Sequence, residues 1–109
     1  MKVDIETVED ITVVTLAGEL DGLAAPAIQQ QLLPIAQAGG KILLNMIGVQ
    51  YMSSSGLRML LSTYRHSSDS GGRIVLVGVA NDIEDTLSMT GLLRSLTVCQ
   101  TVDDGLKAL

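Results

Sequence analysis

The chain alternates short apolar runs with segments in which apolar residues recur at helical spacing, and this alternation limits the folds open to it. Two β-type runs come first, and each later run is separated from the previous one by a helical segment. Two strands joined by a short polar turn form an antiparallel hairpin, whereas strands joined through a helix favour parallel pairing. The order strand-strand-helix, followed by three strand-helix units, therefore predicts an α/β fold with a mixed sheet.

The bounds of these elements follow from local patterns. Period-2 alternation predicts a first strand at 2–6, and a β-branched run predicts a second at 11–17, further inside the sheet. Apolar runs predict further strands at 41–46, 74–77 and 96–99. Helical spacing predicts helices over 28–36, 57–64, 83–90 and 102–109. Asn81 with Glu84 resembles a capping box, and Thr101 can cap the last helix.

Length and composition exclude several classes of function. The 109 residues suffice for one compact core, so we expect a single domain over residues 1–109. No apolar stretch approaches the roughly 20 residues that cross a bilayer, and the acidic, alternating N-terminus is unlike a signal peptide. We therefore expect a cytoplasmic protein with no direct membrane insertion. A net charge of -5, with no Phe and no Trp, argues against nucleic acid as a partner.

The chain has one cysteine and one histidine, which are too few and too far apart for a metal site. Cys99 follows Val98 and is expected to be a buried strand thiol, and His66 is expected on a helix surface. We expect no metal, no cofactor and no internal disulfide. Nothing in the pattern calls for an obligate dimer, so we expect a monomer when the protein is free.

The segment most suggestive of function is Met52–Leu57, with the sequence MSSSGL. It contains three consecutive serines between a buried strand and the start of a helix. One hydroxyl is enough to cap a helix. The other two, followed by Gly56, which would let another chain's backbone approach, point to an exposed and modifiable site at the carboxyl end of a strand.

Other polar and apolar residues are candidates for contacts around these serines. Glu19 and Asp21 fall where a strand gives way to a loop, and Asp21 can alternatively be a turn residue or a helix cap. Leu92, which follows Gly91, is either a core residue or part of a partner-facing apolar patch. Arg58 and Arg65 are seven residues apart and share one helix face.

These motifs give little support to an enzymatic function. A serine nucleophile needs an adjacent base, and His66 lies eleven positions beyond Ser55. The serine segment does not match the Gly-x-Ser-x-Gly nucleophile elbow, and no Gly-rich loop with a lysine is present to cradle phosphates. We therefore expect no catalytic residues, and we expect the protein to receive a phosphate rather than to hydrolyse a nucleotide.

The chain resembles the STAS domain family, and within it the bacterial anti-sigma factor antagonists. The resemblance covers nearly the whole chain and rests on four segments in the family's order and spacing: Leu16–Asp21, Lys41–Val49, Met52–Leu57 and Thr90–Leu92. It implies a four- to five-stranded mixed sheet with an N-terminal hairpin and about four helices, packed mainly on one side.

The resemblance also implies a phosphorylation switch. In the antagonists, an anti-sigma factor that is also a serine kinase phosphorylates the serine just before the Gly-Leu pair, here Ser55, with Ser54 as the fallback. Unphosphorylated antagonist binds the kinase and releases a sigma factor, and a serine phosphatase resets the switch. By the same match, Asp21 falls where the family has an aspartate near the phosphoacceptor, implicated in phosphorylation and partner contact. We expect the surface that meets the kinase to comprise Glu19, Asp21, Ser53, Ser54, Gly56, Leu57, Arg58 and Leu92.

Two positions depart from the family pattern, since Asn45 and Ser53 stand where members often have Asp. This loss of carboxylates favours a different function, a stand-alone STAS subunit that docks permanently on a membrane lipid-transport ATPase or a signalling scaffold. The serine triplet favours the phosphorylation switch, because permanent docking needs no phosphoacceptor. A third function, binding of a small ligand or nucleotide with weak hydrolase activity, would require a concave pocket with convergent polar groups.

Overall fold

The computed structural model describes residues 1–91 and 96–109. Its strands are β1 (Lys2–Val8), β2 (Ile11–Leu20), β3 (Lys41–Met52), β4 (Arg73–Val77) and β5 (Thr97–Cys99). Its helices are α1 (Ala24–Gln37), α2 (Ser54–Asp69), α3 (Asn81–Met89) and α4 (Val102–Ala108). The element order is the one that the apolar periodicity predicts.

The described strands form one mixed sheet in the order β1-β2-β3-β4-β5. The hairpin strands β1 and β2 are antiparallel, and the remaining neighbours are parallel, as expected for strands joined through helices. β1 is an edge strand and largely exposed, whereas β2 is buried over most of its length. The predicted α/β class, mixed sheet and N-terminal hairpin are confirmed.

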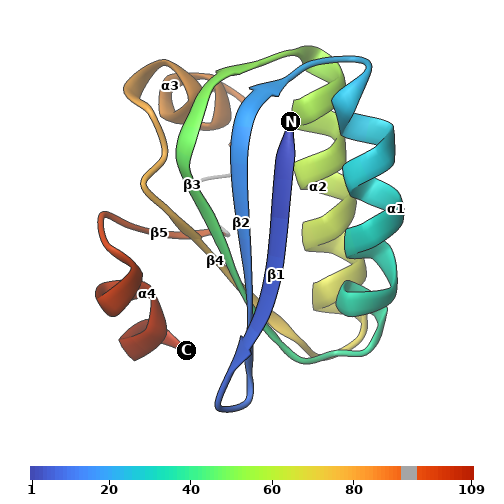
Figure 1. Ribbon diagram of the computed structural model, residues 1–109, viewed down its shortest axis with the longest axis vertical. Coiled ribbons are helices and arrows are strands. Elements are labelled where there is room, and N and C mark those ends of the chain that lie inside the picture. The colour runs from blue at the N-terminus through green and yellow to red at the C-terminus, as the bar shows by residue number, and fades with distance from the viewer. Residues whose placement is uncertain (92–95) are drawn as a thin grey trace.

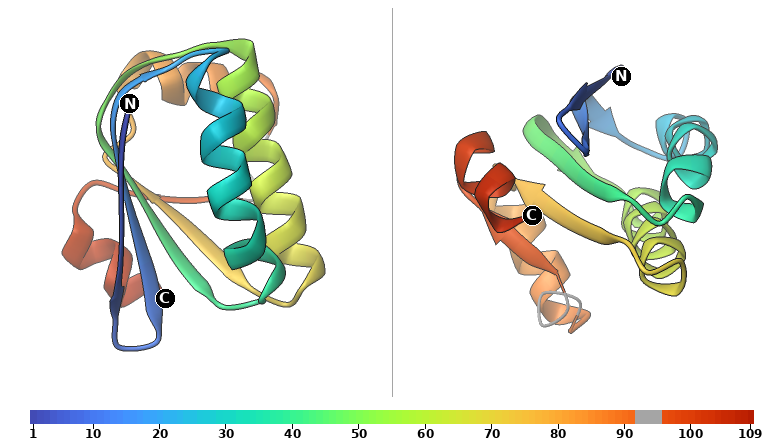
Figure 2. Two further views of the ribbon diagram at one scale, coloured as in Figure 1. Left: turned by 45° about the vertical axis from the view of Figure 1, so that its right-hand side comes forward. Right: turned by 90° about the horizontal axis from the view of Figure 1, so that it is seen from below.

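The sheet is covered on both faces, mainly on one (Figures 1 and 2). Leu44 belongs to the larger core cluster, which also contains Ile28 of α1, Leu60 of α2 and Ile83 of α3. The preceding residue, Leu43, points to the opposite face because side chains alternate along a strand, and it joins a smaller cluster under α4. The uninterrupted apolar runs of the inner strands reflect this burial on two sides.

Two strands extend beyond their predicted ends and reach the candidate site. β2 continues from Ala17 to Leu20, and β3 continues from Met46 to Met52. Register shifts lie between Thr15 and Ala17 and between Gly18 and Glu19, so the pairing continues through an irregular stretch. These irregularities break the apolar alternation, which is why the sequence pattern stops short of the strand ends.

Three smaller expectations were wrong. Ala80, not Asn81, occupies the N-cap position of α3, and no side chain caps that helix. Thr90 is the C-cap rather than a residue within the helix. Cys99 is only half-buried, because β5 is a three-residue edge strand.

Candidate functional site

The loops after β2 and β3 meet at one edge of the sheet. Leu20 and Met52, the last residues of the two neighbouring parallel strands, are register partners. The backbone N–H of Ser53 donates a 2.9 Å hydrogen bond to the carbonyl of Leu20, which ties the β3–α2 connection to the end of β2. The two connections lie side by side at the top of Figure 1 and of the left-hand view in Figure 2. The serines and the β2–α1 loop are therefore neighbours, although they are far apart in the sequence.

Ser53 caps α2, so neither of the next two serines is needed as the helix cap. Its hydroxyl oxygen accepts a hydrogen bond from the N–H of Gly56 at 3.3 Å. Ser54 and Ser55 are the first two residues of the helix, and the first turn contains no acidic residue. Ser54 is exposed and Ser55 is half-buried. The expectation that one serine of the triplet caps the helix is confirmed.

The hydroxyl of Ser55 lies between the β2–α1 loop and the surface of α2. A Cβ placed on Gly22 would lie 3.6 Å from the Ser55 Oγ. On the other side, Nη2 of Arg58 donates to the same Oγ at 3.2 Å. Among the residues that the structure describes, this is the hydrogen bond that the Ser55 side chain makes, and in it the hydroxyl acts as acceptor. Its own proton has no acceptor within residues 1–91 and 96–109.

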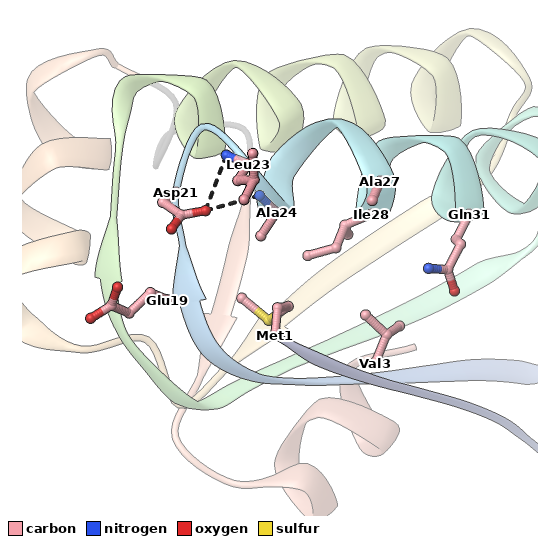
Figure 3. Close-up of a pocket in the computed structure, with 9 residues that line it drawn as sticks. All are labelled: Met1, Val3, Glu19, Asp21, Leu23, Ala24, Ala27, Ile28 and Gln31. Carbon is pink, nitrogen blue, oxygen red and sulfur yellow. Dashed lines mark hydrogen bonds between the residues drawn. The ribbon is translucent and has the colours of Figure 1, made fainter.

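Asp21 organises the start of α1. Its Oδ1 accepts from the N–H of Leu23 at 3.1 Å and from that of Ala24 at 2.9 Å (Figure 3). Helix N-termini present free N–H groups that carboxylates satisfy well. Asp21 thus acts as the turn or capping residue considered for it, although the N-cap position of α1 itself is Leu23. Asp21 also directly precedes Gly22, the residue that faces Ser55, so the loop that contains Asp21 adjoins the serines.

Glu19 and Asp21 border a shallow hollow between the hairpin and α1 (Figure 3). Glu19 lies within β2 rather than in a loop, contrary to expectation, because β2 extends to Leu20. The hollow has a volume of about 450 Å³, and apolar side chains, including the 90% exposed Leu23, form much of its wall. Carboxylates at its edge would repel the phosphates of a nucleotide, whereas an apolar or cationic side chain of a partner protein would suit it.

The remaining predicted site residues have different surroundings. We expected Gly56 to leave its backbone open to another chain, but Gly56 is buried. A Cβ there would lie 2.8 Å from the carbonyl oxygen of Leu20, so the glycine allows α2 to pack against the end of β2. Leu57 packs at the edge of the larger core cluster, and Arg58 is exposed. Leu92 lies outside the described residues.

Both departures from the family pattern keep a hydrogen bond that Asp would also make. The Oδ1 of Asn45 accepts from the N–H of Ile47 at 3.1 Å, next to the irregular stretch of β3. Ser53 caps α2, and Ser and Asp are comparable caps. The substitutions therefore preserve the local backbone and remove negative charge from it.

Sequence reasoning missed two residues of this site, Gly22 and Leu23. Gly22 faces Ser55, and Leu23 places a large apolar side chain in solvent at the start of α1. An apolar residue in an otherwise polar loop was a signal for Leu23. No local pattern marks Gly22, because its contact depends on how two loops meet in space.

His66 is not positioned to act as a general base for Ser55. The Nδ1 of His66 is 2.8 Å from the carbonyl oxygen of Ser62, on its own helix. Within residues 1–91 and 96–109, no cluster of three or more His, Cys, Asp or Glu side chains could hold a metal ion. Among the same residues, no helix has the length and apolar character needed to span a membrane.

Comparison with known proteins places this geometry in a family. The model of the STAS domain matches residues 2–105. The anti-sigma-B factor antagonist of Bacillus subtilis is 26% identical over 107 residues, which cover 98% of each chain. An anti-sigma factor antagonist from Mycobacterium paratuberculosis has a similar crystal structure, with a TM-score of 0.86 and 25% identity over 98% of this chain and 92% of that one.

A third similar structure is that of the Bacillus cell fate determinant SpoIIAA in its phosphorylated form. Its TM-score is 0.79, with 22% identity over 98% of each chain, so this likeness concerns the fold. The family match spans nearly the whole chain and includes both loops of the site. The chain belongs to the STAS domain family.

Proposed function

We propose that this protein is an anti-sigma factor antagonist whose binding is switched by phosphorylation of Ser55. In its unphosphorylated form it binds an anti-sigma factor that is also a serine kinase, and this binding releases a sigma factor. The observation that carries the proposal is the setting of Ser55, a half-buried hydroxyl at the start of α2 whose proton has no acceptor among the residues that the structure describes. In this role the chain is a regulatory binding protein and the chemistry belongs to its partner.

The relatives support the general role. Proteins similar over nearly the full length are named anti-sigma factor antagonists. SpoIIAA, which has the same fold, carries phosphate in one solved form. The choice of Ser55 rests on its position just before the Gly-Leu pair and on its surroundings in this chain.

The modification is a simple phosphoryl transfer. The Ser55 Oγ attacks the γ-phosphorus of ATP bound to the kinase, the new O–P bond forms, and the bond to the β,γ-bridging oxygen breaks. ADP leaves with that electron pair, and the hydroxyl proton passes to a base of the kinase. A serine phosphatase reverses the state by transferring the phosphoryl group to water. Because free N–H groups at the start of α2 favour an anion, the fold accommodates the phosphate.

A second function is permanent docking on a membrane lipid-transport ATPase or a signalling scaffold. The neutral side chains of Asn45 and Ser53 favour it, because they leave the acceptor loop less acidic than in many antagonists. The hydroxyl of Ser55, which donates no hydrogen bond to the described residues, favours the switch, since docking alone does not need a phosphoacceptor. The two functions differ in whether Ser55 becomes phosphorylated.

Partner capture followed by phosphosite mapping tests the proposal. We expect the tagged protein to retain a serine kinase of the anti-sigma type from an extract of its native cells. Incubation of that purified kinase and ATP with the antagonist should place one phosphate on Ser55, with Ser54 as the fallback. Phosphate confined to Ser67, Ser68 or Ser70, or none at all with a kinase shown to bind, would contradict the switch. A captured transporter subunit would favour permanent docking.

The charge and the capping role of Asp21 can be separated by two substitutions. Asn retains an oxygen that accepts the hydrogen bonds from Leu23 and Ala24, so we expect Asp21→Asn to keep its stability and to lose kinase affinity or phosphorylation rate. Ala removes both bonds, and we expect Asp21→Ala to lower the free energy of unfolding by about 1 kcal/mol as well. Denaturant unfolding and kinase titration measure the two effects. If Asp21→Asn binds the kinase and is phosphorylated like wild type, the role of Asp21 is limited to capping α1.

A further inference from the structure

The exposed face of α2 carries positive charge in an otherwise acidic protein. Arg58, Arg65 and His66 line it together with Leu61 and Ser62. In the described part of the chain the one ion pair joins Lys41 and Asp10, and Lys41 is at the opposite end of β3 from the serines. Neither arginine of α2 is therefore paired with a carboxylate there.

Arg58 has a second property that Arg65 lacks, namely its contact with Ser55. The two residues are three apart on the helix, a spacing that brings side chains together on one face. Nη2 of Arg58 already lies 3.2 Å from the Ser55 Oγ, the atom to which a phosphate would be attached. We propose that Arg58 is a positioning residue that pairs with the phosphate of phosphorylated Ser55 and holds it against α2. This inference rests on the proposed modification of Ser55.

The chemistry of the pair suits this role. A guanidinium offers several N–H donors in one plane and binds phosphate oxygens through two parallel hydrogen bonds. The bond to the neutral hydroxyl thus becomes a bond to a group that carries a charge of about -1.5 to -2 at neutral pH. Phosphorylation therefore strengthens the attraction between Arg58 and the side chain of residue 55, and Arg58 needs little change of position to form the new bonds.

The described groups nearest Ser55 oppose the pairing only weakly. The cap residue Ser53 is neutral, and the first turn of α2 contains no acidic residue. The Oδ1 of Asp21 in the adjoining loop accepts two backbone N–H bonds, and these offset part of its charge. With Asp at position 53, a carboxylate would stand at the same helix start as the phosphate. Because Ser53 is neutral and Arg58 is cationic, a phosphate on Ser55 meets less electrostatic repulsion here than it would beside an acidic cap residue.

The test uses protein in which phosphoserine is incorporated at position 55 during synthesis, so that no kinase is needed. Titration followed by ³¹P NMR measures the second ionisation of the phosphate, whose ordinary pKa is about 6. A cation favours the dianion, so we expect Arg58→Gln to raise this pKa by about 0.3 to 0.7, roughly a two- to fivefold change in the ionisation constant. Arg58→Lys should restore part of the shift, and 1 M salt should abolish the difference.

Arg65→Gln is the matched control, because it removes the same charge from the same helix face seven residues further on. That position is ten residues beyond Ser55, about 15 Å along the helix axis, a distance at which salt screens most of the interaction with the phosphate. We expect the phosphate of the Arg65→Gln variant to have the same second pKa as that of the phosphorylated wild type. Equal pKa values for Arg58→Gln and Arg65→Gln would overturn the pairing. Because the phosphate is installed synthetically, that outcome is independent of whether a kinase modifies Ser55.

Discussion

Phosphorylation of Ser55 is expected to weaken binding of the kinase by a hundredfold or more while the fold remains intact. The phosphate adds a charge of about -1.5 to -2 at the point where the β2–α1 loop meets α2. A partner docking there must desolvate this hydrated group or push it aside, and burial of an incompletely paired charge costs several kcal/mol. Each 1.4 kcal/mol corresponds to about tenfold in affinity. Arg58 offsets part of the charge but leaves its bulk and hydration on the docking surface.

Titration of the kinase against wild type, phosphorylated protein, Ser55→Asp and Ser55→Ala measures this effect. We expect Ser55→Ala to bind constitutively and Ser55→Asp to bind more weakly than wild type, though less weakly than the phosphorylated protein. Ser68→Asp is a suitable control, since it adds the same charge to exposed surface at the other end of α2, about 20 Å away along the helix. Thermal midpoint and circular dichroism should be nearly unchanged throughout. Equal binding by all four proteins would reject the switch and favour permanent docking.

The sequence predicts the order and type of the elements because their periodicity is strong. β3 shows the limit of that approach. Its first half is a continuous apolar run, since residues such as Leu43 and Leu44 are buried on opposite faces of the sheet. Its second half passes through Gly48 and is mostly exposed without regular alternation, so the pattern ends while pairing with β2 continues. Tertiary pairing, not local propensity, determines where this strand stops.

Helix starts show a similar limit. Ser53 caps α2, as expected for a serine before a helical segment. Asn81 has equally good capping chemistry, yet α3 begins one residue earlier, and the N–H of Glu84 bonds to the carbonyl of Ala80. The position of the cap depends on how the chain leaves β4. Gly78 turns it there with a φ of 67°, next to Ile47 of β3. A local sequence motif cannot contain that information.

The candidate site was predictable as a set of segments but not as a set of contacts. Parallel neighbours end at the same edge of a sheet, so the loops containing Asp21 and Ser55 were expected to be close. The capping bonds of Asp21, the approach of Gly22 to Ser55 and the bond from Arg58 depend on side-chain positions within those loops. The role of Gly56 was misjudged for the same reason.

Replacement of Gly56 by Ala is expected to lower the free energy of unfolding by about 1 to 3 kcal/mol, the usual range for overpacking a tight site. The new Cβ would lie 2.8 Å from the carbonyl oxygen of Leu20, 2.9 Å from its Cγ and 2.7 Å from the Cγ of Met52. Met52 can adjust its flexible side chain. The Leu20 carbonyl cannot move cheaply, because it accepts the hydrogen bond from Ser53 that joins the two loops. This strain exceeds the benefit of up to about 1 kcal/mol that Ala brings to a helix.

Denaturant unfolding of Gly56→Ala and of the control Gly40→Ala tests this account. Gly40 is exposed, and a Cβ there would meet no heavy atom within 4 Å, so we expect a change within about 0.5 kcal/mol. Because the strain in Gly56→Ala separates α2 from the end of β2, it also displaces Ser55 from Gly22. Kinase affinity should therefore fall even at temperatures where the variant is fully folded. A Gly56→Ala protein as stable as wild type that nevertheless loses kinase binding would mean that the glycine serves the partner's approach rather than internal packing.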